Sequence, residues 1–121
     1  MTQVGEHAVV LGASLAGLAA AAALADRFHR VTIVERDTLR RSEDYRKGIP
    51  QGRHVHILLP AGLAGLTGLL PGVVDDLRGR GAGVIHTTEL RFHIDGGSLL
   101  LDKADLKIVG ATRPLLESVV R

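Results

Sequence analysis

Gly12, Ser14 and Gly17 occupy the three positions of a glycine pattern that follows a short apolar run, Ala8–Leu11. Glycine at position 12 allows a sharp turn from strand to helix, and Gly17 lets that helix lie close to the first strand. Ser14 stands where the strict pattern has its second glycine, and its hydroxyl can donate a hydrogen bond to a phosphate oxygen. The free N–H groups at the start of the helix favour an anion. The spacing predicts a phosphate-binding turn.

An acidic residue, Glu35, ends a second apolar run, Val31–Val34, and lies 23 positions after Gly12 (12 to 35). A carboxylate about 20 residues beyond such a turn accepts hydrogen bonds from a dinucleotide ribose, which favours a free 2′-hydroxyl over a 2′-phosphate. We therefore predict an α/β, Rossmann-like FAD/NAD(P)-binding domain that begins with a βαβ unit and a parallel sheet. The two apolar runs are expected to be strands buried on both faces. The candidate cofactor-binding residues of this unit are Gly12, Ala13, Ser14, Leu15, Ala16, Gly17 and Glu35.

Apolar residues at helical spacing predict two further helices, over 60–70 and 73–77, separated by Pro71-Gly72. Residues 89–94 and 99–101 are predicted to form a small β-hairpin around Asp95-Gly96-Gly97. The last segment is predicted to be a helix with Thr112 as its cap. It reaches barely two turns before Arg121, so we expect a truncated unit, a single partial dinucleotide-binding domain over 1–121.

The composition is that of a small globular domain: 121 residues, 45% hydrophobic, with a net charge of +2. The chain has no cysteine, which excludes disulfides and thiolate chemistry and agrees with a cytoplasmic protein. Residues 8–25 carry no charge, but no Lys or Arg precedes them and Gly12 and Gly17 interrupt them, which argues against export or membrane insertion. The small net charge, without aromatic residues among the basic ones, argues against nucleic-acid binding.

Several segments occur here in one order and carry a family resemblance: VVLGASLAGLAAAAAL, VTIVERD, GIPQGRHVHILLPAGL, LLPG followed by DDL, and TRPLLESVVR. Together they resemble the N-terminal FAD-binding part of FAD-dependent oxidoreductases of the flavoprotein monooxygenase type. The resemblance covers nearly all of this chain, and serine at position 14 is an accepted variant among these relatives.

The resemblance implies that FAD lies across Gly12–Gly17 with its adenosine ribose on Glu35. It also implies that Arg36 and Arg53 flank the cofactor, with Arg53 nearer the pyrophosphate or flavin, and that Arg113 opens a later helix facing it. In an intact relative NAD(P)H is the expected reductant and a small organic molecule the substrate. We expect this chain to be catalytically incomplete alone, and no catalytic residue is assigned.

The polar stretch 36–53 holds six basic and three acidic residues and is predicted to be a long surface connection. Apart from Arg36 and Arg53, its basic residues are interpreted as a solvated face; they are Arg40, Arg41, Arg46 and Lys47. His54 and His56 could point two rings to one side of an extended segment. We predict no metal site there, because zinc needs further ligands and no cysteine is present.

Two alternatives remain open. A nicotinamide dehydrogenase domain has a similar glycine pattern. The short-chain type is disfavoured, because it needs a Tyr-x-x-x-Lys pair for proton transfer, whereas Tyr45 is the one tyrosine of the chain, is followed by Lys47 and lies close to Pro50 in a predicted loop. The second alternative is a non-catalytic, truncated fragment that needs a partner, either a complementary chain or another copy of itself in a homo-oligomer.

Overall fold

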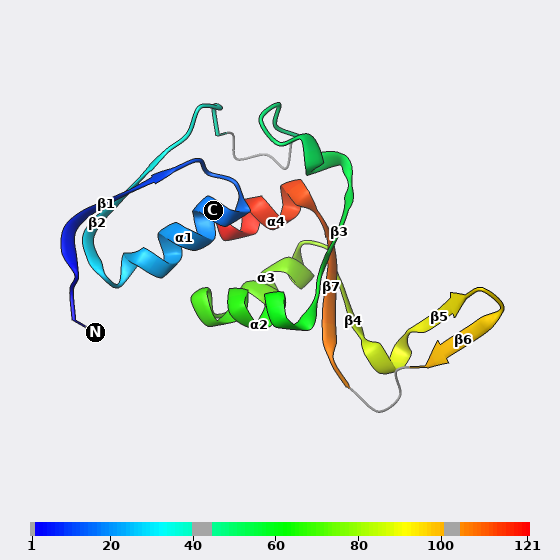
Figure 1. The fold of residues 1–121 in the computed structure, drawn as a ribbon. Helices are drawn as coiled ribbons and strands as arrows, with labels where there is room; N and C mark the ends of the chain where they lie inside the picture. The colour runs from blue at the N-terminus through cyan, green and yellow to red at the C-terminus, as the bar shows by residue number, and fades with distance from the viewer. Residues whose placement is uncertain (1, 40–44, 101–104) are drawn as a thin grey trace.

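The computed structural model describes residues 2–39, 45–100 and 105–121 of the chain. Figure 1 shows their arrangement, with the β5–β6 hairpin projecting away from the helices. In chain order the elements are β1 (Gly5–Leu11), α1 (Leu15–Ala25), β2 (Phe28–Val34), the 3-10 helix η1 (Pro50–Arg53), β3 (Val55–Leu58), α2 (Pro60–Leu69), α3 (Val73–Gly79), β4 (Gly83–His86), the 3-10 helix η2 (Thr87–Glu89), β5 (Arg91–Ile94), β6 (Gly97–Leu100), β7 (Lys107–Thr112) and α4 (Arg113–Val120).

The first unit is the predicted strand, helix and parallel strand. β1 pairs with β2 in parallel, with Val9 opposite Thr32 and Leu11 opposite Val34. α1 connects the two strands and packs against both of them. The side chains directed at the helix are the better buried ones, with Val10 at the limit of full burial. The βαβ-type start predicted from the sequence is confirmed at this level.

The prediction that both strands are buried on two faces is wrong. Val9 and Val34 are exposed, and Leu11 retains 81% of its accessible surface. These residues alternate with the ones that face α1, because successive side chains in a strand point to opposite sides. Among the described residues α1 covers one face of the β1–β2 pair, and the other face stays open.

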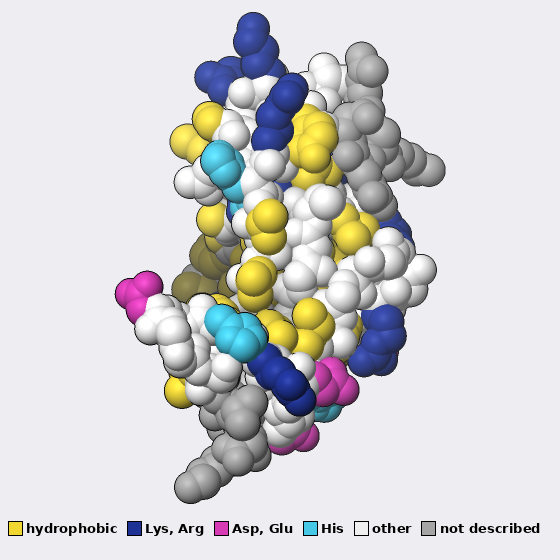
Figure 2. Space-filling model, turned by 90° about the vertical axis from the view of Figure 1, so that its right-hand side faces the viewer, with side chains coloured by type: hydrophobic (Ala, Val, Ile, Leu, Met, Phe, Trp, Pro, Cys, Tyr) yellow, Lys and Arg dark blue, Asp and Glu magenta, His cyan; other side chains and the backbone are white. Residues whose placement is uncertain are grey.

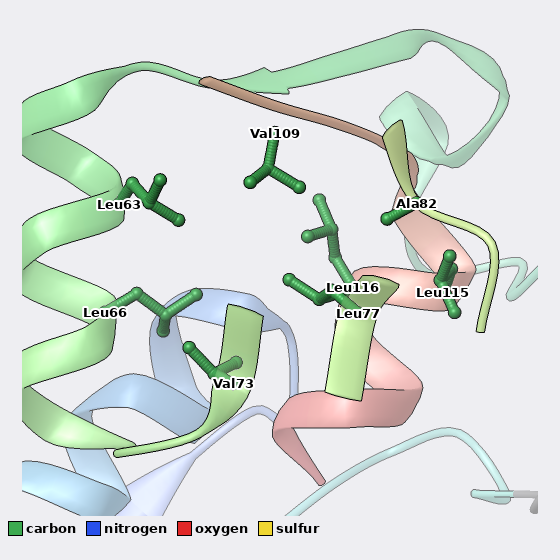
Figure 3. Packing of buried hydrophobic residues seen from close by; sticks show 8 residues of the cluster. All are labelled: Leu63, Leu66, Val73, Leu77, Ala82, Val109, Leu115 and Leu116. Carbon is green, nitrogen blue, oxygen red and sulfur yellow. The ribbon is translucent and has the colours of Figure 1, made fainter. Parts of the chain in front are cut away.

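A second, antiparallel sheet has the order β3-β7-β4. The main hydrophobic core lies between this sheet and helices α2, α3 and α4, where Leu77 and Val109 are fully buried (Figure 3). The cluster consists of Leu63, Leu66, Val73, Leu77, Ala82, Val109, Leu115 and Leu116. The helices predicted over 60–70, 73–77 and the C-terminal segment therefore have a common partner. Their sheet was not predicted, because its strands come from distant parts of the chain: Val55 pairs with Thr112, and Gly83 pairs with Gly110.

Outside this core several apolar side chains face outward. On β3 and just beyond it Val55, Ile57 and Leu59 are exposed, at alternate positions along an extended segment. Figure 2, which views the side of the molecule that carries this sheet and the hairpin, shows hydrophobic side chains spread over that face.

The predicted hairpin is confirmed between β5 and β6. Ile94 pairs with Gly97, so the turn consists of Asp95 and Gly96, which have φ angles of 38° and 82°. Two successive residues with positive φ are typical of the tight hairpin turns that Asp-Gly favours. Glu89 belongs to η2 rather than to the strand, and Leu101 lies outside the described residues.

The cap predicted for the last helix is also confirmed. The side-chain oxygen of Thr112 accepts a hydrogen bond from the N–H of Leu115 at 3.2 Å. Pro114 follows in the first turn, where its missing N–H costs no hydrogen bond. α4 therefore begins directly at the end of β7 and runs beside α1.

The described chain is thus a mixed α/β structure with one parallel strand pair and two small antiparallel sheets. None of its described helices is long and apolar enough to cross a membrane.

Candidate functional site

The glycine turn joins β1 to α1. Gly12 has a φ of +93°, a conformation that side-chain-bearing residues rarely adopt, and its N–H donates to the carbonyl oxygen of Val34 at 2.7 Å. A Cβ at Gly12 would meet nothing within 4 Å, so the backbone conformation, and not a steric clash, demands glycine there. A Cβ at Gly17 would overlap the carbonyl oxygen of Gly12. The local geometry therefore requires glycine at both motif positions.

The N-terminus of α1 presents backbone donors. Ser14 is the N-cap residue, and its carbonyl oxygen accepts the first helical hydrogen bond, from Leu18 at 2.9 Å. Within the described chain no side chain caps this end, and the first turn contains no acidic residue. The N–H groups of residues 15–17 have no acceptor within the helix, as in any first turn. They remain available to an anion.

Glu35 stands at the end of β2 and contacts the glycine turn. One carboxylate oxygen, Oε2, accepts the N–H of Ala13 at 2.6 Å, and the other, Oε1, accepts the N–H of Asp37 at 2.9 Å. These two backbone hydrogen bonds, with a further contribution from Arg46, lower the pKa of Glu35 from 4.5 to about 2. The carboxylate is therefore ionised at neutral pH and acts as a hydrogen-bond acceptor.

Arg46 lies across the same turn. Its Nη2 donates to the carbonyl oxygen of Ala13 and to Oε2 of Glu117, each at 2.8 Å, while Nη1 lies 3.2 Å from Oε2 of Glu35. The Arg46 side chain is 13% exposed. The interpretation of Arg46 as part of a solvated face is wrong, because two carboxylates and a backbone carbonyl hold its guanidinium at the site.

The network continues into α4. Glu117, whose side chain is 6% exposed, also accepts a hydrogen bond from Nε of Arg113 at 2.9 Å. Two arginines and two carboxylates thus alternate in the order Glu35, Arg46, Glu117, Arg113. The pairing satisfies charges that burial alone would penalise. It links the end of β2, the turn before α1 and the start of α4.

Two hollows flank the N-terminal end of α1. The first, of about 500 Å³, is lined by Leu11, Gly12, Ser14, Val34, Glu35, Arg36, Asp37, Arg46, Gly48 and Ile49. The second, of about 400 Å³, is lined by Leu15, Ala16, Ala19, Leu58, Gly62, Gly65, Leu66, Leu69 and Arg113. The first is rich in charged groups and the second is mainly apolar. The structure therefore divides the predicted motif residues between two sides of the helix start.

The other predicted arginines lie on the surface. Arg36 lines the first hollow with an 82% exposed side chain, and its Nε is 3.9 Å from the carboxylate of Asp37. Arg53 is exposed in η1, with its guanidinium 5.5 Å from the ring centre of Tyr45, and it does not line the first hollow. Lys47 is exposed. Arg40 and Arg41 lie outside the described residues.

The His54–His56 pair lies at the start of β3. Nδ1 of His56 is 2.7 Å from the carbonyl oxygen of His54, so that ring nitrogen already has a local partner. In the described part of the chain no three His, Cys, Asp or Glu side chains form a group that could hold a metal ion.

Sequence reasoning missed the role of Arg46 and Glu117. Their contact joins residues 71 positions apart, and no local pattern announces it. The spacing of Arg113 and Glu117 gives a weaker signal, since residues four apart on a helix share one face. That signal predicts the Arg113–Glu117 pair but not the third partner.

No family model matches the chain. Protein Rv3254 of Mycobacterium tuberculosis (strain ATCC 25618 / H37Rv) is 44% identical to it over 72 residues, which is 60% of this chain. The chain spans about 15% of the length of this curated relative. The name of that protein states no activity, so the likeness assigns none to this chain.

Proposed function

We propose that this chain binds FAD through the glycine turn and Glu35, as the cofactor-binding portion of an oxidoreductase of the flavoprotein monooxygenase type. One observation carries the proposal. The ionised carboxylate of Glu35 accepts the N–H of Ala13 at 2.6 Å, which brings the acid of β2 to the uncapped N-terminus of α1 in one hollow. A ribose acceptor and a set of phosphate donors then lie side by side, as a Rossmann-like dinucleotide site requires.

The acceptor capacity of Glu35 fits a ribose. A carboxylate offers about four acceptor positions, and three are used here by Ala13, Asp37 and Arg46. The remaining position is on Oε1, which accepts one further hydroxyl hydrogen. Because the carboxylate is ionised, it repels a 2′-phosphate, which favours FAD or NAD over NADP.

The start of α1 fits a pyrophosphate. Its free N–H groups and the positive end of the helix dipole attract an anion, and no acidic side chain in the first turn opposes this. The space around the missing Cβ of Gly12 is open, so the backbone is accessible there. Arg36, with an 82% exposed side chain, adds positive charge at the first hollow, whereas Arg113 at the second is paired with Glu117.

Bound FAD would supply the redox chemistry of a monooxygenase, with NAD(P)H as reductant and a small organic substrate. The residues of this chain bind and orient the cofactor: Glu35 accepts from the ribose, and the helix start holds the phosphates. We assign no catalytic residue to the described chain.

A titration of the purified chain with FAD, followed by quenching of flavin fluorescence, tests the proposal. Micromolar binding is expected for the wild type, weaker by about tenfold or more in Glu35→Gln, because a charged hydrogen-bond partner is lost. Glu6→Gln, which changes a carboxylate on β1 that is 89% exposed and contacts only the exposed His29 among the described residues, is the matched control and should bind as the wild type. Tighter binding of NAD than of FAD, measured by displacement of FAD, would favour the dehydrogenase alternative, and an absence of binding to either cofactor would refute the proposal.

A second candidate, a module that functions with a complementary chain or a second copy of itself, is favoured by the open apolar face of β1–β2. Val9, Leu11 and Val34 are exposed there on neighbouring strands. Contiguous apolar surface of this kind marks interaction sites. Sedimentation analysis at increasing concentration should show self-association, reduced in Val9→Ser; a monomer at all concentrations would contradict the homo-oligomer.

A further inference from the structure

Arg46 and Glu35 together hold both backbone polar groups of one residue in the glycine turn. The N–H of Ala13 donates to Oε2 of Glu35, and the carbonyl oxygen of Ala13 accepts from Nη2 of Arg46. The two side chains contact one another through Nη1 and Oε2 at 3.2 Å. Ala13 is 1% exposed, so solvent does not compete for these groups. The ion pair therefore closes a ring around Ala13, whose N–H and carbonyl belong to the two peptide units on either side of this residue, directly before the N-cap of α1.

We propose that Arg46 is a positioning residue of the dinucleotide site, which with Glu35 clamps Ala13 and so fixes the backbone donors at the start of α1. This inference rests on the proposed function, because positioning has meaning only if those donors receive a phosphate. Ala13 immediately precedes Ser14, the N-cap residue, so the orientation of the Ala13–Ser14 peptide, whose carbonyl Arg46 holds, sets the direction of the first free N–H groups.

The anchoring of Arg46 supports this role. Its Nη2 also donates to Glu117 on α4, a carboxylate that is itself held by Arg113. A planar guanidinium holds its donors in fixed directions that suit these three acceptors, whereas the three donors of an ammonium group rotate about one point. With carboxylates on two sides, Arg46 is already neutralised and is not a free phosphate ligand. It acts on the cofactor through Glu35 and Ala13.

The test combines FAD affinity with hydrogen exchange at the Ala13 amide, measured by NMR on the whole chain. Arg46→Met is expected to weaken FAD binding about tenfold, from the loss of charge-assisted hydrogen bonds. It should also reduce protection of the Ala13 amide, and Arg46→Lys should restore part of both. Arg78→Met removes an exposed arginine whose described ion pair is with Asp75, and serves as the matched control.

A double-mutant cycle separates positioning from general damage. If Arg46 acts through Glu35, the effects of Arg46→Met and Glu35→Gln on FAD affinity are strongly non-additive, whereas independent sites would add. If Arg46→Met does not fold, Glu117→Gln weakens the anchor of Arg46 together with the Arg113–Glu117 pair and leaves the Glu35 and Ala13 contacts of Arg46 in place, so it should give a smaller loss in the same two readouts.

The outcomes are distinguishable. Unchanged Ala13 protection and FAD affinity in Arg46→Met, or additive effects in the cycle, would overturn the clamp. If the wild type does not bind FAD while Arg46→Met still exposes the Ala13 amide, the proposed function fails and the clamp is a structural feature without a cofactor role.

Discussion

The β1–α1–β2 unit and the β3-β7-β4 sheet with its helices are held together by different forces. The sheet unit buries a cluster of leucine and valine side chains between strands and three helices. The β1–α1–β2 unit buries few large side chains, and Leu11 and Val34 remain exposed. Its turn is fixed instead by ionic contacts among Glu35, Arg46 and Glu117.

The residues that supply most of the stability and the residues of the candidate site therefore lie in different parts of the chain. Apolar burial supplies most of the favourable free energy of folding, so the sheet unit is expected to dominate unfolding. The β1–α1–β2 unit, which carries the candidate site, depends on backbone geometry and on charges, which determine the orientation of its groups more than the total stability of the chain. α4 joins the two, because it contributes Leu116 to the core and Glu117 to the ionic network.

The largest effect on stability is expected in the hydrophobic core. Leu77→Ala, at a side chain with no exposed surface, should lower the free energy of unfolding by about 2–5 kcal/mol. Leu11→Ala removes the same atoms from the open face of β1 and should change it by less than about 0.5 kcal/mol. Urea unfolding of both variants measures this, and equal losses would show that the open face is covered in solution.

The next effect concerns backbone geometry in the site unit. Gly17→Ala places a Cβ against the carbonyl oxygen of Gly12, and the resulting shift should cost about 1–3 kcal/mol. Because the turn must move, FAD affinity should fall at least about tenfold. Gly68→Ala on α2 meets open space and should stabilise the chain by about 0.5–1 kcal/mol. Similar behaviour of the two variants would contradict the close approach.

The pH dependence of stability tests the contribution of the Glu35 charge. The pKa of Glu35 is about 2 in the folded chain against 4.5 ordinarily, so the unfolded state binds more protons between these values. The contribution of Glu35 is complete above pH 4.5 and is lost as the pH falls toward 2. Thermal unfolding between pH 7 and pH 3 should therefore be less pH-dependent in Glu35→Gln than in the wild type, and equal pH dependence of the two would contradict this role of Glu35.

The smallest effect lies at the junction of β7 and α4. Thr112→Ala removes the hydroxyl that accepts the N–H of Leu115, and should cost about 1 kcal/mol. Thr112→Ser keeps the oxygen and should cost less. Thermal unfolding of the two variants distinguishes them, and an unchanged midpoint in Thr112→Ala would show that water replaces the cap.

Local patterns predicted much of the chain and failed where partners are distant. Gly12 and Gly17 announced the turn, Asp95-Gly96 the hairpin and Thr112 the helix cap, because each rule involves neighbouring residues. The antiparallel sheet was missed, because β3 and β4 pair with the distant strand β7 and no local turn joins them, whereas a tight turn joins β5 to β6. Arg46 was misassigned because charged residues in a polar stretch are usually solvated.

By itself the sequence determined the order of strand, helix and strand at the start of the chain, and it placed Glu35 at the end of the second strand. These features follow from backbone conformation and side-chain periodicity, which act over a few residues. The tertiary structure alone decided which arginine reaches the turn and which face of β1 stays open. Arg46 contacts Ala13 and Glu117 across 33 and 71 positions, and only tertiary packing, in which α4 lies beside α1, brings those groups together.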